Sequence, residues 1–202
     1  MDNEKQIVLF LKENTVFNEL QIAAKINERH SILGSPITIP YDSKNENNPL
    51  IIFNKGIMNF TMNRSDASFL FKEEDSETCM KIINDIMELF DDNNIEFIRL
   101  GYITTHVHTK KEKEKFVKKM FVQPDLLNGD FNLAWYKNEL IDSVRVNVWE
   151  RHITDSISNV DYVTIIDINT PRDKEYNITS DFVTDFLKKC DKYIDKILDE
   201  RI

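Results

Sequence analysis

The feature that most constrains this chain is the order of its hydrophobic patterns. Short segments in which apolar and polar residues alternate are followed by a long segment with apolar residues every three or four positions, and this order occurs twice. Alternation is typical of half-buried strands, and the longer period is typical of amphipathic helices. The pattern therefore predicts an α+β protein with a mostly antiparallel sheet and two long helices on one face, arranged as two similar strands-then-helix halves.

The first half, residues 1–121, contains most of the predicted strands. A long amphipathic helix is expected after Asp75 or Ser76, and a short basic helix is expected at Lys110–Phe121. The predicted strands of this half are Val16–Ile26, Leu50–Phe53, Ile57–Met62, Ala67–Lys72 and Ile95–His108. Because Ile95–His108 has apolar residues on both faces, we expect it to lie inside the sheet.

The start of the chain also fits a helical interpretation. Glu4–Asn14 and Val16–Asn27 could be the first two helices of a helix-turn-helix, which would indicate DNA binding. The charges within this segment nearly cancel, and phosphate contacts supply most of the affinity for DNA. We therefore keep the DNA-binding helix-turn-helix only as an alternative.

The second half, residues 122–202, opens with a connector at Val122–Asp130. Strands are expected at Phe131–Lys137, Leu140–Ile153 and Val160–Asn169, with a hairpin turn at Asn138-Glu139. The last long helix is expected to begin at Ser180. A chain of 202 residues is long enough for one good core, so the two halves are expected to form one compact domain.

Composition narrows the classes of function. The 35 acidic and 26 basic residues give a net charge of -9, which disfavours binding to nucleic acid. No stretch has the length of a membrane span, and no signal peptide is evident. The two cysteines, Cys79 and Cys190, fall on apolar helix faces and are expected to act as small hydrophobic residues. These features predict a cytoplasmic protein without a membrane segment.

One charged residue stands out in the predicted Ile95–His108 strand. Arg99 lies among apolar residues, and an unpaired buried guanidinium would destabilise the fold by several kcal/mol. Glu19 and Asp167 are the natural carboxylate partners, because each lies mid-strand beside apolar neighbours. The favoured interpretation is a structural ion pair, and the alternative is a charged pocket that holds an anionic ligand through Arg99.

A second polar group follows one face of the predicted strand Leu140–Ile153. Arg145, Asn147, Trp149 and Arg151 alternate with valines that would face the core. Arginine beside tryptophan can hold a nucleotide by stacking and phosphate contact. An ordinary solvent-exposed face with one aromatic ring is the more common explanation of such a pattern.

Signals for a metal or for catalysis are weak. His106 and His108 would point to the same side of a strand, which suits two metal ligands, but no third ligand has a recognisable spacing. The six lysines of residues 110–119 are interrupted by two glutamates and fit a solvated helix face. No glycine-rich phosphate loop, nucleophile elbow or activated cysteine is present, so we predict no catalytic residues and no cofactor.

Four short stretches make the chain resemble a sporadically distributed bacterial protein family without an established activity. They are Thr15-Val16-Phe17-Asn18-Glu19-Leu20, Ile52-Phe53-Asn54, Ile98-Arg99-Leu100-Gly101-Tyr102-Ile103 and Ile165-Ile166-Asp167-Ile168. Together they span nearly the whole chain. The resemblance implies a compact two-part α+β fold and no known catalytic residues.

Our first hypothesis for function is a non-enzymatic interaction protein of a mobile element or of a defence or counter-defence system, which binds a protein partner or associates with itself as a homodimer. The second is a binder of a small anionic, nucleotide-like ligand, or an enzyme acting on one. Its pocket would lie between the sheet and the helices and would be lined by Arg99, Arg145, Trp149 and a carboxylate. The third is the DNA-binding protein described above.

Overall fold

The computed structural model describes residues 2–42, 48–121, 130–155 and 160–202. The strands are β1 (Glu4–Leu11), β2 (Ile37–Thr38), β3 (Ile51–Phe53), β4 (Met58–Met62), β5 (Asp66–Lys72), β6 (Phe97–Val107), β7 (Asn132–Ile141), β8 (Val144–Asp155) and β9 (Val160–Asn169). The α-helices are α1 (Glu19–Arg29), α2 (Ser76–Asp92), α3 (Lys110–Met120) and α4 (Ser180–Arg201), and two 3-10 turns lie at Ser31–Leu33 and Glu73–Asp75.

The strands form one nine-stranded sheet in the order β2-β3-β4-β5-β1-β6-β9-β8-β7. Each of the eight pairs of neighbouring strands is antiparallel. The two predicted halves meet where β6 pairs with β9, so the sheet continues across them without an edge. The predicted α+β class with a large antiparallel sheet is confirmed.

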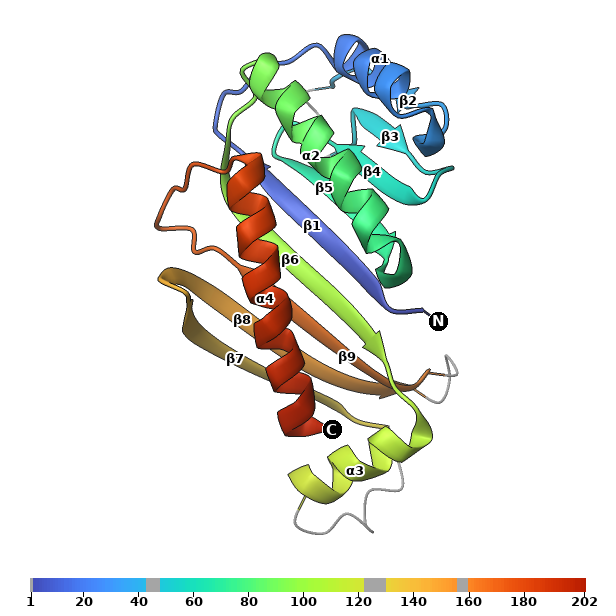
Figure 1. Cartoon of the computed structure of the whole chain (residues 1–202), viewed down its shortest axis with the longest axis vertical. Helices are drawn as coiled ribbons and strands as arrows, with labels where there is room; N and C mark the ends of the chain where they lie inside the picture. Colours follow the sequence, from blue (N-terminus) through green and yellow to red (C-terminus); the bar gives the residue numbers. More distant parts are fainter. Residues whose placement is uncertain (1, 43–47, 122–129, 156–159) are drawn as a thin grey trace.

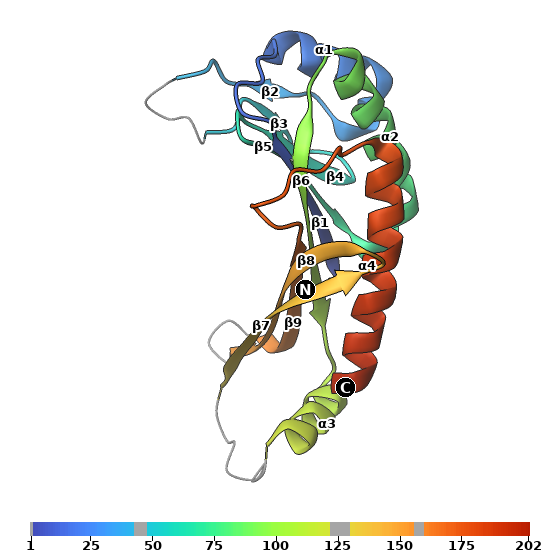
Figure 2. The same ribbon diagram turned by 90° about the vertical axis from the view of Figure 1, so that its left-hand side faces the viewer.

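Helices α2 and α4 lie side by side along one face of the sheet, and the opposite face has no helix over it among the described residues (Figures 1 and 2). Helix α1 lies beside α2 at the end of the sheet that carries β2 and β3, and α3 lies at the other end (Figure 1). The loop between β9 and α4 bends onto the open face (Figure 2). Both long helices begin where the sequence predicted.

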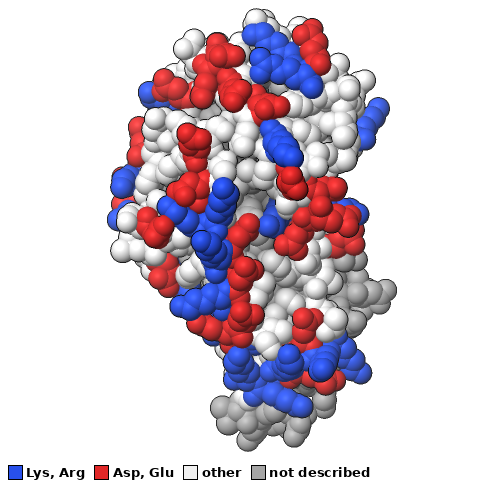
Figure 3. Space-filling view, viewed as in Figure 1, with Lys and Arg blue, Asp and Glu red and all other residues white. Residues whose placement is uncertain are grey.

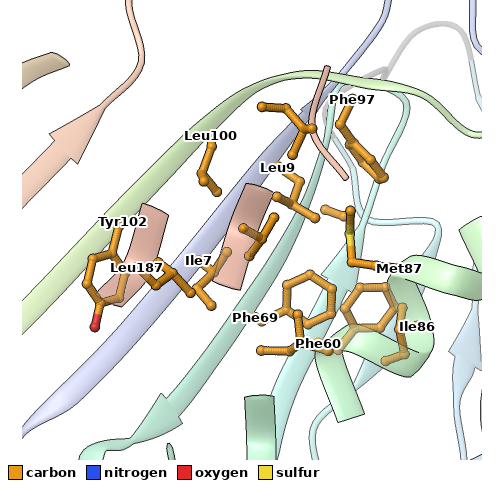
Figure 4. Packing of buried hydrophobic residues seen from close by; sticks show 14 of the residues in the cluster. Ile7, Leu9, Phe60, Phe69, Ile86, Met87, Phe97, Leu100, Tyr102 and Leu187 are labelled. Atoms are coloured by element: carbon orange, nitrogen blue, oxygen red, sulfur yellow. The ribbon is translucent and has the colours of Figure 1, made fainter. Parts of the chain in front are cut away.

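The core fills the space between the sheet and the helices. Ile7 and Leu9 of β1 are fully buried there beside Phe60, Phe69 and Met87 (Figure 4). The rings of Phe60 and Phe69 stack with centroids 4.8 Å apart. Burying an aliphatic or aromatic side chain of this size contributes roughly 1.5–3 kcal/mol, so this layer holds the helices on the sheet.

Helix α4 also has polar anchors. Tyr102 of β6 is buried and donates its hydroxyl to Asp191 Oδ1 of α4 at 2.7 Å. Lys5 Nζ of β1 lies 3.2 Å from Asp191 Oδ2. These contacts fix the position of α4 along the two central strands.

The structure corrects the N-terminal prediction. Residues Glu4–Leu11 form the central strand β1, and the segment predicted as the strand Val16–Ile26 is largely the helix α1. The side chain of Asn18 caps α1 by accepting from the Gln21 N–H at 3.0 Å. Because β1 is extended, the alternative helix-turn-helix is wrong as well. The strand prediction counted Val16 and Leu20 as core residues. In the structure these side chains are 82% and 65% exposed.

The second-half hairpin also differs from the prediction. Its turn lies at Asp142-Ser143 rather than at Asn138-Glu139, so β7 continues to Ile141. Both turn residues have positive φ, 50° and 77°, as a two-residue hairpin turn of the primed type requires. The strand Val160–Asn169 is confirmed to the residue.

In the part of the chain that the structure describes, no helix combines the length and the apolarity needed to cross a membrane.

Candidate functional site

The open face of the sheet carries a pocket of about 630 Å³ beside the loop that follows β9. It is lined by Phe10, Arg99, Asn138, Arg145, Asn147, Trp149, Asn169, Pro171, Arg172 and Asp173. We expected a pocket between the sheet and the helices. The side chains that we had named, Arg99, Arg145 and Trp149, do line one pocket, but on the opposite face.

Strand alternation explains why these side chains point away from the core. On β8, Val146 and Val148 are fully buried toward the helices, so Asn147 and Trp149 face the other side. On β6, Leu100 is buried, and Arg99 before it faces the open side. The expectation that Arg145, Asn147 and Trp149 share a face opposite to the valines is confirmed.

A glycine shapes the floor of the pocket. Gly101 of β6 pairs with Asn169 of β9, and Asn169 pairs with Asn147 of β8. A Cβ atom on Gly101 would lie 2.5 Å from Asn169 Oδ1 and 3.7 Å from the ring of Phe10. The missing side chain therefore allows the Asn169 amide and the Phe10 ring to lie against β6.

The loop after β9 forms one wall and is fixed at its base. Thr170 is fully buried, and its backbone N–H donates to the Leu100 carbonyl at 2.9 Å. Its hydroxyl oxygen accepts from the Leu100 N–H at 2.9 Å. The Tyr176 N–H donates to the Ile98 carbonyl at 2.9 Å. The segment between these anchors places Arg172 and Asp173 at the rim.

Arg99 has no carboxylate partner among the described residues. Its guanidinium lies over the Phe10 ring, 4.4 Å from the centroid, and its Nε donates a long bond of 3.4 Å to the Thr170 carbonyl. Burial lowers the pKa of Arg99, and the positive charge of Arg172 lowers it further. Two guanidinium groups therefore lie close enough to repel each other in this pocket.

The predicted ion pairs of Arg99 are wrong. Glu19 is the first residue of α1 and pairs with Arg64, Oε2 to NH2 at 3.5 Å. Asp167 lies on β9 and accepts from the Asn169 side chain. Burial raises the pKa of the Asp167 carboxyl, although the bond from Asn169 opposes this effect. Neither carboxylate lines the pocket.

The β8 residues differ in their surroundings. Arg145 pairs with Asp173 of the loop, which partly neutralises that side of the pocket. Trp149 is 49% exposed and lies beside Tyr136 of β7, with ring centroids 4.7 Å apart. Arg151 faces the same side but is held by Asn132, Nε to Oδ1 at 2.8 Å, and does not line the pocket.

The two histidines do not share a ligand position. His106 Nε2 lies 3.0 Å from Thr104 Oγ1, and His108 Nε2 lies 2.9 Å from Thr164 Oγ1. Burial lowers the pKa of His106, and it lowers that of His108 to about 4. Within residues 2–42, 48–121, 130–155 and 160–202, no three His, Cys, Asp or Glu side chains are grouped so that they could hold a metal ion.

A buried polar network that we did not predict lies under α3 and the end of α4. Glu150 is 2% exposed and accepts from Arg201 Nε at 2.8 Å. His152 is fully buried, with Nε2 at 2.8 Å from Glu150 Oε1 and Nδ1 at 2.6 Å from the Tyr162 hydroxyl. Phe116 of α3 stacks on the imidazole of His152 at 4.3 Å.

The sequence did contain a signal for this network. Glu150 and His152 continue the buried face of β8 that begins with Val146 and Val148, so alternation alone places them inside. A carboxylate and an imidazole at buried positions require partners. Their position against the core, away from the pocket, indicates a structural role.

The lysines of residues 110–119 lie on α3, where Thr109 and Glu112 form a capping box. They gather at the lower end of the molecule (Figure 3). The rest of the face seen in Figure 3 mixes acidic and basic side chains, as expected of a solvated surface. Only Phe116 of α3 is buried, so the helix presents most of its charged side chains to water.

Comparison with protein-family models gives no match. Comparison with curated proteins gives no significant match. One solved structure, described as "Structure of Rolling Circle Replication Initiator Protein from Geobacillus stearothermophilus", aligns with 87% of this chain and 75% of its own chain, at 9% identity and a TM-score of 0.30. A score this low supports no inference about fold or function. The resemblance to the sporadically distributed bacterial family stays a prediction.

Proposed function

We propose that this protein binds a small anionic ligand in the pocket on the open face of its sheet. The observation that carries the proposal is the pair Arg99 and Arg172. Both line the pocket, and neither forms an ion pair with a carboxylate of the described residues. An anion between them would replace repulsion with charge-assisted hydrogen bonds, for which the guanidinium geometry is well suited.

The other lining groups favour a ligand that also carries a flat ring. Trp149 offers a half-exposed indole, and aromatic side chains stack on nucleobases with about 1–3 kcal/mol per base. Asn138, Asn147 and Asn169 supply amide groups that can donate to or accept from the edge of a ring. We therefore propose a nucleotide-like ligand, with its phosphate at the arginines and its base at Trp149.

Isothermal titration calorimetry tests this proposal with adenosine, AMP, ATP and inorganic phosphate as probes. We expect ATP and AMP to bind more tightly than adenosine or phosphate alone, and we expect the affinity to fall with added salt. Arg99→Ala and Arg172→Ala should each weaken nucleotide binding by about tenfold or more.

Arg151→Ala is the matched control, because this arginine lies on the same strand face outside the pocket. It should leave nucleotide affinity unchanged. The proposal is wrong if none of the four probes binds at about 1 mM, or if the Arg99 and Arg172 variants bind ATP as tightly as the original chain.

A protein contact is the second candidate function. The observation that favours it is a groove of about 520 Å³ between α1 and the segment around β2, lined by Val16, Leu20 and Ile39. Val16 and Leu20 are 82% and 65% exposed, and neighbouring exposed apolar side chains often mark protein contact surfaces. We propose that a partner with apolar side chains covers this groove. A Leu20→Asp variant that keeps every protein contact of the original chain would contradict the idea.

We further propose that the protein works in the cytoplasm. Cys79 and Cys190 are free and buried, as is common in a reducing compartment. Cell fractionation followed by detection of the tagged chain tests this, and recovery mainly in an extracellular or membrane fraction would contradict it.

A further inference from the structure

The two edges of the sheet differ greatly. One edge is β2, which has only the two residues Ile37–Thr38. The other is β7, which has ten residues and pairs with β8 from Asn132 to Ile141 without a bulge. No strand among the described residues pairs with its outer side. Natural edge strands are usually short, bulged or interrupted by proline, because an open edge pairs readily with another chain. β7 is long, has no bulge or proline, and its two charged residues, Lys137 and Glu139, have opposite signs.

The hairpin turn shows which backbone groups of β7 are free. A two-residue primed turn at Asp142-Ser143 makes its flanking residues, Ile141 and Val144, a hydrogen-bonded pair. Every second residue back from Ile141 then exchanges bonds with β8. The residues between them direct their N–H and C=O groups outward, and these are Ala134, Tyr136, Asn138 and Leu140.

The side chains of β7 favour a second copy of this chain as the partner for those groups. If two β7 strands pair antiparallel about a two-fold axis at Asn138, Lys137 of each copy lies opposite Glu139 of the other. The same register places Tyr136 opposite Leu140 of the second copy. Tyr136 is 49% exposed and Leu140 is 70% exposed in the single chain. Opposite charges and apolar pairs directly across antiparallel strands are both stabilising.

Other registers do not place opposite charges across from each other. An axis at Tyr136 would put Lys137 opposite Trp135 and Glu139 opposite Leu133, which leaves both charges without an opposite charge across the interface. Lys137 and Glu139 contact each other within one chain, Nζ to Oε1 at 3.3 Å, with 38% of each side chain exposed. They remain accessible to a second copy, and both lie at the centre of the strand.

We propose that β7 is a self-association edge, through which two copies join their sheets about an axis at Asn138. In such a dimer, the open faces of the two sheets form one continuous surface across the junction. This inference rests on the backbone edge and on Lys137, Glu139, Tyr136 and Leu140, none of which lines the anion pocket. Asn138, at the axis, does line the pocket, so the junction lies beside the ligand site.

Sedimentation velocity across a concentration series, with charge-exchange variants, tests the interface. The original chain should form dimers at micromolar concentration. Lys137→Glu and Glu139→Lys should each weaken dimerisation by about tenfold, because each places two pairs of like charges across the junction. The double variant should restore the dimer. Lys81→Glu, at an exposed lysine of α2 that pairs with Glu77, is the control and should have no effect.

Cross-linking tests the register. Asn138→Cys brings two thiols together at the axis, so a short bismaleimide should give a covalent dimer. Tyr136→Cys places its two thiols four positions apart, roughly 14 Å along the strands, and should not be linked by the same reagent. The native Cys79 and Cys190 are buried and do not compete. Far-ultraviolet circular dichroism confirms that each variant is folded.

A chain that stays monomeric at about 100 μM overturns the proposal. So does a dimer that is indifferent to the charge exchange, or one that cross-links through Tyr136→Cys and not through Asn138→Cys. Because the Lys137 and Glu139 variants leave the pocket intact, they should keep nucleotide affinity. Failure of the dimer is thus distinguishable from failure of the ligand proposal.

Discussion

Arg201, at the end of α4, donates from Nε to Oε1 of Glu150 at 2.8 Å, while Glu150 itself is 2% exposed in the sheet. This bond connects the last turn of the chain's longest helix to the middle of β8. The Arg201 guanidinium also lies 5.4 Å from the centre of the Trp135 ring on β7. One side chain therefore holds α4 against two strands.

Replacing Arg201 with Leu should destabilise the protein strongly. The change leaves the Glu150 carboxylate buried without its cationic partner, which typically reduces the free energy of unfolding by about 3 kcal/mol. Urea denaturation followed by circular dichroism measures it. Arg29→Leu is the control, because its pair with Asp92 is exposed and 4.0 Å long, and it should change stability by less than about 1 kcal/mol. Equal effects of the two variants would contradict the assigned role of Arg201.

Stability should fall as the pH is lowered from about 6.5 to 4. Burial lowers the pKa of His108 from 6.5 to about 4, so in this range the unfolded chain binds a proton that the folded chain does not. Each such proton changes the free energy of unfolding by at most about 1.4 kcal/mol per pH unit. The lowered pKa values of His30 and His106 act in the same direction. In the His108→Gln variant, the urea midpoint should depend less steeply on pH than in the original chain. An unchanged pH dependence would exclude His108 as a cause of the stability loss.

Glu150 makes the stability of the protein depend on pH at still lower pH values. Burial alone would raise the pKa of its carboxyl, but the hydrogen bonds from His152 and Arg201 outweigh burial, and the pKa is lowered from 4.5. Its contribution to stability is therefore complete above about pH 4.5 and is lost as the pH falls through its folded-state pKa. Arg201→Leu should reduce this acid-side loss, because it removes one of the groups that lower the pKa. Denaturation curves between pH 5 and 3 measure the difference.

Gly101→Ala should weaken ligand binding more than it weakens the fold. The new Cβ would lie 2.5 Å from Asn169 Oδ1, the far end of a side chain that can turn away, so the pocket loses the amide position while the strands stay paired. We expect nucleotide affinity to fall by about fivefold, with a stability loss below about 1 kcal/mol. Gly56→Ala is the contrast, because its Cβ would meet the Ile32 carbonyl at 2.3 Å and should destabilise the fold severely. Unchanged affinity in Gly101→Ala would argue against a role for Asn169.

Ser143→Gly should stabilise the protein. Ser143 has φ of 77°, which side-chain-bearing residues adopt at an energetic disadvantage and glycine does not. The substitution should raise the free energy of unfolding by about 1 kcal/mol. Asp142 is retained because it pairs with Lys189 of α4 at 3.2 Å. A lowered urea midpoint would show that the Ser143 side chain stabilises the fold by more than its positive φ destabilises it.

Periodicity predicted most of the elements, and it failed where local patterns are ambiguous. The meander β3–β5, the strands β6 and β9, and the helices α2 and α4 all have clear periods and appear where expected. Glu4–Leu11 was missed because Val8 and Phe10 are apolar as well as Ile7, Leu9 and Leu11, so the segment has little alternation. The hairpin turn was misplaced because Asn138 and Asp142-Ser143 are all turn-forming residues, so this part of the sequence contains two candidate turns.

The pocket was predicted only in part, for a different reason. Alternation identified Trp149 and Arg145, and Arg99 stood out as a charge among apolar residues. Phe10, Asn169 and Arg172 were missed, because nothing in the sequence tells which strands become neighbours or where the loop after β9 folds back. Because the order of the strands was unknown, Arg99 was also paired wrongly with Glu19 and Asp167.

The central position of β1 has a consequence for how the chain acquires its structure. β1 precedes both of its lateral partners in the chain, and these lie far downstream, at Asp66–Lys72 and Phe97–Val107. Until β6 has been synthesised, the apolar side chains of β1 lack one of the two strands that lie beside them, which favours slow folding and early dependence on chaperones. Deleting residues 4–11 would divide the sheet into two blocks with an unfilled gap between them.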